Sequence, residues 1–374
     1  MRVLILSCNT GEGHNAAGKA VLDYVVRQGH EAVLTDVMLL AGRRTSRTVG
    51  GAYVGIVKKT PRFFALLYKA GSLISSAKWR SPVYYANTLL CNSLGEYLAQ
   101  NNFDVIVTPH LFAAEALTCL KNRGLLRQKV ISVGTDYTCI PFWEETKCDY
   151  YVIPHPDIAE EYVSRGIPRE KLLPYGIPVG LSFCQKKNKA DARQACGLPS
   201  RGPAYLIMSG SMGFGKVKDL TRELLRQSGS KEQVVVICGS NEKLRDNLQE
   251  EFRSSGNVHI LAYTDRVSDY MDACDVVFTK PGGLTSTEAA VKNIPIVHTA
   301  PIPGCETKNM DFFVSRGMSV TAAEIPEQAA AGRRLARQKN DRDSMQKAQS
   351  RQISSAAAKD IFQLLLTLSG EDKT

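Results

Sequence analysis

The sequence has no C-x-x-C pair and no long apolar run, and both absences narrow the class of protein. Its ten cysteines are scattered through 374 residues without metal-ligand spacing, which indicates reduced thiols in a cytoplasmic protein. No apolar run approaches the roughly 18 residues of a membrane-spanning helix, and the apolar start, residues 2–7, is too short for a secretion signal. We therefore expect neither a disulfide scaffold nor a spanning helix, and any membrane contact should be peripheral.

Acidic residues are missing from one stretch of the first half, residues 37–95. The same stretch is rich in basic and aromatic side chains, a mixture typical of short amphipathic helices on an anionic lipid surface. The net charge of +10 also favours an anionic partner. A solvated basic face and a nucleic-acid site are the alternatives, although no nucleic-acid recognition module is present. The residues that we expect at the membrane are Arg43, Arg44, Arg47, Lys58, Lys59, Phe63, Phe64 and Trp79.

The length and the order of the predicted elements indicate two α/β domains. The chain is too long for one typical core, and its 44% hydrophobic and 22% charged residues are those of a globular protein. Each half opens with an apolar strand, a Gly-rich turn and a helix, which predicts a parallel sheet in each. The boundaries that we assign are 1–183 for the first domain, 184–203 for a polar linker, 204–345 for the second domain and 346–374 for a C-terminal helix and tail.

His14 stands out in the first half because it follows the first strand and begins a helix. The positive end of a helix disfavours the imidazolium, so we expect a neutral ring that can act as a general base. A surface histidine without a catalytic role is the alternative. Two later strands end beside His110 and Asp136, and ligands bind beyond the carboxyl ends of parallel strands. We therefore expect these three side chains to converge on one crevice, with Trp143 at its lip.

The strongest ligand signal in the second half is the turn Pro281-Gly282-Gly283 between an apolar strand and a helix. Glycines let a ligand approach the backbone, and the free N–H groups of a helix start favour an anion. Glu288 lies about one turn inside this helix, where a carboxylate can accept two hydroxyl hydrogen bonds. An ordinary β-α-β turn that binds nothing is the alternative.

Two further motifs are incomplete. The segment 210–216 has the G-x-x-x-x-G-K spacing of a phosphate-binding loop, but Val217 replaces the Ser or Thr that would hold Mg²⁺. The first Gly-rich turn, G-E-G-H-N-A-A-G, places its third glycine two positions late for a dinucleotide fingerprint. These departures disfavour a nucleoside triphosphatase and an NAD-dependent dehydrogenase, and we predict no metal site.

The motifs, taken in order, resemble a family of GT-B glycosyltransferases. This family includes the monogalactosyldiacylglycerol synthases, the processive diacylglycerol glucosyltransferases and the peptidoglycan precursor N-acetylglucosaminyltransferase. The segments that carry the resemblance are the G-x-G-H turn Gly11-Glu12-Gly13-His14, Thr135-Asp136-Tyr137 with Trp143, Gly176-Ile177-Pro178, and Lys280-Pro281-Gly282-Gly283-Leu284-Thr285 with Glu288. Together they span most of the chain, from residue 2 to residue 317.

The resemblance implies two Rossmann-like domains facing across a cleft, with the C-terminal helix returning to the first domain. It implies inverting, metal-independent transfer of a hexose from a UDP-sugar to diacylglycerol or a glycosyl-diacylglycerol, with no cofactor and no nucleic acid. The enzyme would then lie in the cytoplasm, peripherally bound to the inner face of the cell membrane. His14 would be the base, and Asp136 would orient either His14 or the acceptor.

The resemblance also implies two sets of binding residues. Those expected for the donor are Ser209, Gly210, Ser211, Gly213, Tyr263, Val267, Pro281, Gly282, Gly283, Leu284, Thr285, Glu288, Glu306 and Asn309. Those expected for the acceptor are Gly13, His110, Tyr137 and Trp143. Cys305 stands where many relatives have Gln, which leaves the identity of the sugar open.

Two other functions fit the same motifs. One is another enzyme on the same fold, a UDP-N-acetylglucosamine 2-epimerase or a transferase with a polyprenyl-linked acceptor. The other is a non-catalytic nucleotide-sugar sensor at the membrane, which the presence of both His14 and Glu288 disfavours.

Overall fold

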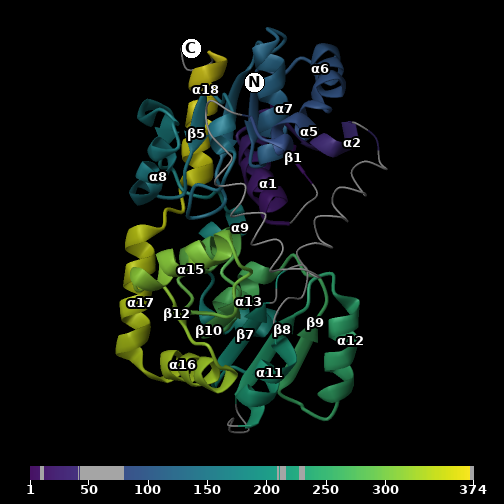
Figure 1. The fold of residues 1–374 in the computed structure, drawn as a ribbon. Coiled ribbons are helices and arrows are strands. Elements are labelled where there is room, and N and C mark those ends of the chain that lie inside the picture. Colours follow the sequence, from purple (N-terminus) through teal and green to yellow (C-terminus); the bar gives the residue numbers. More distant parts are fainter. Residues whose placement is uncertain are drawn as a thin grey trace. The chain divides into compact units, whose positions relative to one another are not determined.

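The chain forms two compact α/β units, each with its own parallel sheet (Figure 1). The computed structural model describes residues 1–8, 12–40, 42, 80–208, 210, 216–226 and 232–370. Unit 1 comprises Met1–Leu181, Pro303–Cys305 and Ser354–Thr374, and unit 2 comprises Ser182–Ile302 and Glu306–Ile353. The chain therefore crosses between the units more than once.

Unit 1 contains a six-stranded sheet in the order β2-β1-β3-β4-β5-β6, with every pair parallel. The strands are β1 (Arg2–Ser7), β2 (Glu31–Asp36), β3 (Val105–Thr108), β4 (Lys129–Val133), β5 (Tyr150–Val152) and β6 (Leu172–Leu173). The order changes direction at β1, because β2 lies on one side of it and β3 on the other. In an open parallel sheet, the carboxyl ends of two such strands form the ligand-binding edge.

Helices cover this sheet and bury its apolar side chains. They are α1 (Glu12–Arg27), α2 (Val37–Leu40), α5 (Pro82–Thr88), α6 (Cys91–Gln100), α7 (Leu111–Asn122), α8 (Ala159–Ser164) and α18 (Ala357–Ser369), with short 3₁₀ turns at η1 (Trp143–Glu145), η2 (Pro156–Ile158) and η3 (Arg169–Lys171). Ile361, Phe362 and Leu365 of α18 join the core formed by β1, β3 and α1, and Figure 1 shows α18 (yellow) among the elements of unit 1. The C-terminal helix therefore belongs to the N-terminal unit, as the resemblance implies.

Unit 2 contains a second six-stranded parallel sheet, in the order β12-β11-β10-β7-β8-β9. The strands are β7 (Ala204–Met208), β8 (Gln233–Ile237), β9 (Val258–Leu261), β10 (Val276–Thr279), β11 (Ile296–His298) and β12 (Val320–Thr321). Every residue of β8 and β10 is buried, as expected for strands covered by helices on both faces. Here the order changes direction at β7, so the edge beyond β7 and β10 is the expected binding edge.

The helices of unit 2 pack closely on this sheet. They are α9 (Leu181–Cys184), α10 (Lys189–Ala195), α11 (Val217–Arg226), α12 (Glu242–Glu251), α13 (Val267–Ala273), α14 (Gly283–Lys292), α15 (Cys305–Ser315), α16 (Ile325–Arg337) and α17 (Lys339–Gln352). A side chain at Gly332 of α16 would overlap the ring of Phe278 in β10. Glycine at this position lets α16 approach the central strands.

Two expectations about chain segments differ from the structure. The segment 184–203, expected to be a linker, contains α10, and Arg193 in that helix is buried and pairs with Asp275 at 2.9 Å. It is therefore part of unit 2. The second domain, expected to end at residue 345, also differs, because α17 (Lys339–Gln352) extends unit 2 beyond that residue.

Candidate active site

His14 lies in the first turn of α1, at the binding edge of the unit 1 sheet. Its Nδ1 atom lies 2.9 Å from the carbonyl oxygen of Pro109, which follows β3, and 3.1 Å from Oγ1 of Thr135, which follows β4. A carbonyl oxygen can only accept a hydrogen bond, so Nδ1 carries the proton of the neutral ring. The lone pair is therefore on Nε2, which has no hydrogen-bond partner among the described residues.

The surroundings of His14 keep the ring neutral. Burial lowers its pKa below the usual 6.5, while the negative charge of Asp136 and the hydrogen bond to Pro109 act in the opposite direction and only partly offset this effect. The ring is therefore unprotonated near pH 7, and Nε2 is available to accept a proton. Asp136 acts on His14 through its charge, whereas Pro109 and Thr135 hold the Nδ1 side of the ring.

His110 lies beside His14, as the sequence predicted, with the two ring centroids 4.7 Å apart in an edge-to-face arrangement. Its Nδ1 atom accepts the backbone N–H of Phe112 at 3.2 Å and thereby caps α7. Burial, together with the neighbouring His14, lowers the pKa of His110 well below 6.5. His110 is therefore a neutral capping residue at the edge of the site.

The other residues expected at the acceptor differ in their exposure. Gly13 is partly exposed beside His14, whereas Tyr137 is buried. Trp143 is only 4% exposed and packs edge-on against Tyr151, with the ring centroids 6.4 Å apart. The expected position of Trp143 at an exposed lip is therefore wrong, because the indole forms part of the core of unit 1.

In unit 2, two glycines lie at the binding edge of the sheet and are each close to Lys280. Gly210 follows β7 with a φ of +69°, and a Cβ atom there would lie 2.7 Å from Cε of Lys280. Gly282 is the N-cap residue of α14 and has no side chain to satisfy the first N–H groups of the helix. The backbone is therefore open to a ligand at the start of α14, as the Gly-rich motif predicted.

Glu288 lies in the middle of α14 and is partly buried. Burial raises the pKa of its carboxyl group to about 8. No residue that the structure describes forms a hydrogen bond or an ion pair with this carboxyl group. A buried carboxyl group without a protein partner is suited to receive hydroxyl groups of a ligand.

Glu306 and Asn309, both expected at the sugar, lie in the first turns of α15 and differ in their contacts. Asn309 is fully buried, and its Nδ2 atom donates to the carbonyl oxygen of Pro281 at 3.1 Å. Its side chain therefore holds the Gly-rich turn in place. Glu306 pairs with the ammonium group of Lys280 and accepts the N–H of Ile302 at 2.8 Å.

The remaining predicted donor residues have varied positions. Gly283 and Leu284 are buried at the start of α14, and Thr285 is partly exposed. Tyr263 is 76% exposed in the loop before α13, and Val267 begins that helix. Ser209, Ser211 and Gly213 lie outside the described residues, as do all eight residues expected at the membrane, Arg43, Arg44, Arg47, Lys58, Lys59, Phe63, Phe64 and Trp79.

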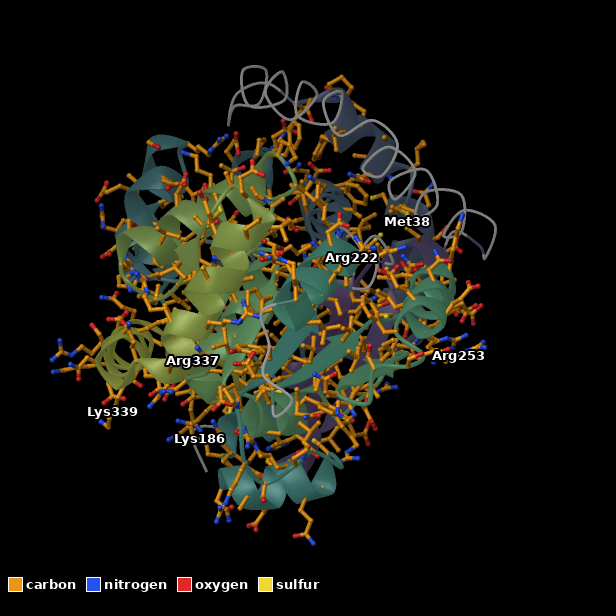
Figure 2. All side chains as sticks on the ribbon, turned by 90° about the horizontal axis from the view of Figure 1, so that it is seen from below. Met38, Lys186, Arg222, Arg253, Arg337 and Lys339 are labelled. Atoms are coloured by element: carbon orange, nitrogen blue, oxygen red, sulfur yellow. The ribbon has the colours of Figure 1, made fainter. Side chains whose placement is uncertain are left out.

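Several basic side chains of unit 2 are surface charges outside this site. Figure 2 shows Arg253 and Lys339 projecting outward from the ribbon. The side chain of Lys339 is 76% exposed and pairs with Asp343 one turn later in α17. Arg337, which is also labelled, is 59% exposed and pairs with Glu232 at 2.7 Å. These residues contribute to the net charge of the chain but do not surround the Gly-rich turn.

Sequence reasoning did not assign a role to Pro109, Thr135 or Lys280. The contact from Pro109 comes from a backbone carbonyl 95 residues away from His14, which side-chain patterns do not reveal. Thr135 and Lys280 each stand immediately beside a predicted site residue at the end of a strand. Their position at the end of a strand was the signal in the sequence that could have identified both as site residues.

The sequence matches the models of two known protein families. The sequence model described as Monogalactosyldiacylglycerol (MGDG) synthase matches residues 14–179, and that of the Glycosyltransferase family 28 C-terminal domain matches residues 204–365. A relative from Oryza sativa subsp. japonica, named Probable monogalactosyldiacylglycerol synthase 2, chloroplastic, is 30% identical over 88% of this chain and 72% of its own. The chain belongs to the monogalactosyldiacylglycerol synthase family. The resemblance inferred from the motifs is thereby confirmed, and the protein is a glycosyltransferase.

Other relatives agree with this family. The Processive diacylglycerol beta-glucosyltransferase of Staphylococcus carnosus is 28% identical over 63% of this chain, and the match spans 60% of that relative. Acinetobacter baumannii MurG has a similar structure, with a TM-score of 0.63 and 15% identity over 98% of this chain and 99% of its own. At this identity the similarity shows the fold alone, and it confirms the predicted GT-B class.

Proposed function

We propose that this glycosyltransferase moves a hexose from a UDP-sugar to the hydroxyl group of diacylglycerol or of a glycosyl-diacylglycerol. The observation that carries the proposal is His14, a neutral base at the binding edge of unit 1 whose Nε2 lone pair meets no hydrogen-bond donor within the described part of the chain. The family relatives named above support the acceptor, because their names specify diacylglycerol.

In the proposed reaction, Nε2 of His14 takes the proton of the acceptor hydroxyl group. The hydroxyl oxygen forms a bond to the anomeric carbon, and the bond from that carbon to the diphosphate oxygen breaks on the opposite face. This displacement inverts the anomeric centre and releases UDP. Asp136 stabilises the imidazolium that forms, because its charge already raises the pKa of His14.

The donor is proposed to bind at the Gly-rich turn of unit 2. Glu288 accepts the ribose hydroxyl groups, and the open N–H groups at the start of α14 face the diphosphate. A helix N-terminus stabilises the negative charge that develops on a leaving diphosphate. We therefore propose that no metal ion is required, and the rate should be unchanged when a chelator is added.

A peripheral position at the inner face of the cell membrane completes the proposal. Large apolar side chains are exposed on and near α5, where Tyr85 is 63% exposed and Leu89 is 82% exposed. Leu125 is 64% exposed and lies between Arg123 and Arg127 in the sequence. Apolar side chains beside basic ones favour an anionic lipid surface. Among the residues that the structure describes, no helix has the length and apolar character needed to cross a bilayer.

The experiment that tests this proposal offers the protein a panel of UDP-sugars together with diacylglycerol in anionic vesicles. Lipid products are identified by mass, and vesicles without diacylglycerol are the control. We expect hexose to be added to the lipid from UDP-glucose or UDP-galactose. Conversion of free UDP-N-acetylglucosamine without any lipid product would favour the epimerase, and UDP binding without turnover would favour the sensor.

A further inference from the structure

Lys280 and Glu306 form an ion pair next to Gly282, in the turn that we assign to the donor diphosphate. The ammonium group of Lys280 contacts Oε1 of Glu306, and their side chains are 18% and 9% exposed. The other carboxylate oxygen, Oε2, accepts the N–H of Ile302 at 2.8 Å. Glu306 is therefore held in place by the backbone, whereas Lys280 extends toward it from the end of β10.

The two glycines of the site leave room for this pair. A Cβ atom at Gly282 would lie 3.5 Å from Nζ of Lys280 and 4.0 Å from Oε1 of Glu306. At Gly210 it would lie 2.7 Å from Cε of the same lysine. The lysine side chain therefore runs over the bare backbone of Gly210, which follows β7, and ends over Gly282, which begins α14.

Among the residues that the structure describes, the charges next to the start of α14 are unbalanced. The start of α14 carries the positive end of the helix dipole, and the ammonium group of Lys280 adds a full positive charge next to it. Glu306 supplies one negative charge. Burial raises the pKa of Glu288 to about 8, so that its carboxyl group is mostly uncharged near pH 7 and adds little. The site therefore favours a ligand with more negative charge than one carboxylate.

We propose that Lys280 binds the diphosphate of the donor and that the ion pair between Lys280 and Glu306 exists only while the donor is absent. When the donor binds, the ammonium group of Lys280 leaves Glu306 and pairs with the diphosphate, because the diphosphate carries more negative charge than a carboxylate. Glu306 then becomes available to accept hydroxyl groups of the sugar. This inference rests on the proposed function, because it requires a nucleotide diphosphate sugar as donor.

The exchange has a direct consequence for ligand affinity. In the free protein, a diphosphate must compete with Glu306 for Lys280, and this competition weakens binding. Removing the charge of Glu306 should therefore tighten the binding of UDP. A purely structural ion pair predicts the opposite, because the loss of either partner would loosen the turn and weaken every ligand.

The experiment measures the affinities of UDP and uridine by calorimetry for the wild type, Lys280→Met and Glu306→Gln. We expect Lys280→Met to weaken UDP binding by about tenfold or more, as for loss of a charge-assisted hydrogen bond. Uridine, which has no phosphate, should bind equally well to all three proteins. Glu306→Gln should bind UDP more tightly than the wild type and should transfer sugar more slowly.

Two further variants serve as controls. Lys308→Met removes an exposed lysine from the same helix as Glu306 and should leave both affinities unchanged. The double variant Lys280→Met with Glu306→Gln leaves no buried unpaired charge, so it keeps the test valid if Lys280→Met alone fails to fold. It should still bind UDP more weakly than the wild type, because no ammonium group faces the diphosphate.

The outcomes separate this inference from the proposed function. If the wild type binds UDP but Lys280→Met changes UDP and uridine affinity equally, the diphosphate role of the lysine is wrong. If Glu306→Gln weakens UDP binding or leaves it unchanged, the exchange is wrong. If the wild type does not bind UDP at all, the proposed donor is wrong, and the inference falls with it.

Discussion

The raised pKa of Glu288 makes a quantitative prediction about donor binding. In the free protein its carboxyl group has a pKa of about 8 because of burial. At pH 7 the group is then about nine-tenths protonated. If ribose hydroxyl groups donate hydrogen bonds to it, the ionised form is stabilised and the pKa falls on binding. UDP binding should therefore release a proton from Glu288.

The number of protons released follows from the pKa of about 8. At pH 7 the release should be roughly 0.9 proton per UDP, and at pH 9, where the free carboxyl group is already ionised, it should fall to roughly 0.1. Ionising the group at pH 7 costs about 1.4 kcal/mol, which corresponds to about tenfold in affinity. The contribution of Glu288 to UDP binding should accordingly increase as the pH rises from 7 to 8.

The assay is calorimetry in buffers with different ionisation enthalpies, where the slope of the observed enthalpy gives the number of protons released. Glu288→Gln is the control, because the phosphates of UDP titrate in the same way with both proteins. At pH 7 the wild type should release roughly 0.9 proton more per UDP than the variant. Equal slopes, or equal UDP affinities, would show that Glu288 does not receive the ribose.

Three other predictions concern unit 1. Asp136→Asn removes the charge that raises the pKa of His14, so the acidic limb of the profile of kcat/KM against pH should move to lower pH; an unmoved limb would contradict the electrostatic role of Asp136. Thr135→Val removes one of the two acceptors at Nδ1 of His14 and should lower kcat by about tenfold, whereas Thr135→Ser should restore it and UDP affinity should stay constant in both. Glu115 is fully buried and burial raises its pKa from 4.5 to about 8, so the folded state binds the proton more tightly and loses stability as the pH rises between these values. In urea unfolding, the free energy of unfolding of the wild type should fall by roughly 3 kcal/mol between pH 4.5 and pH 7 relative to that of Glu115→Gln. Parallel plots of this free energy against pH for the two proteins would contradict the prediction.

The sequence predicted most of the fold, because apolar strands and Gly-rich turns are local signals. The helices that follow β1, β7 and β10 begin where glycine or a polar residue follows an apolar strand. The linker prediction failed for a non-local reason. The segment 184–203 is polar, but Arg193 within it pairs with Asp275, 82 residues later in the chain.

The candidate site was predicted less completely than the fold. His14 and Glu288 were found because each follows a glycine motif at the end of a strand. The orientation of His14 depends on a carbonyl oxygen of Pro109, and that of Lys280 on an acid 26 residues away. Trp143 was misplaced because its burial depends on packing against Tyr151, which a motif in the sequence does not describe.

The most direct test of the account compares wild type and His14→Ala in two measurements on the same preparations. The first is hexose transfer from a UDP-sugar to diacylglycerol in anionic vesicles, and the second is UDP affinity. We expect the variant to lose transfer while binding UDP as the wild type does, because His14 supplies the base and belongs to unit 1, whereas the residues assigned to the donor belong to unit 2. A variant that transfers hexose at the rate of the wild type would contradict the central claim.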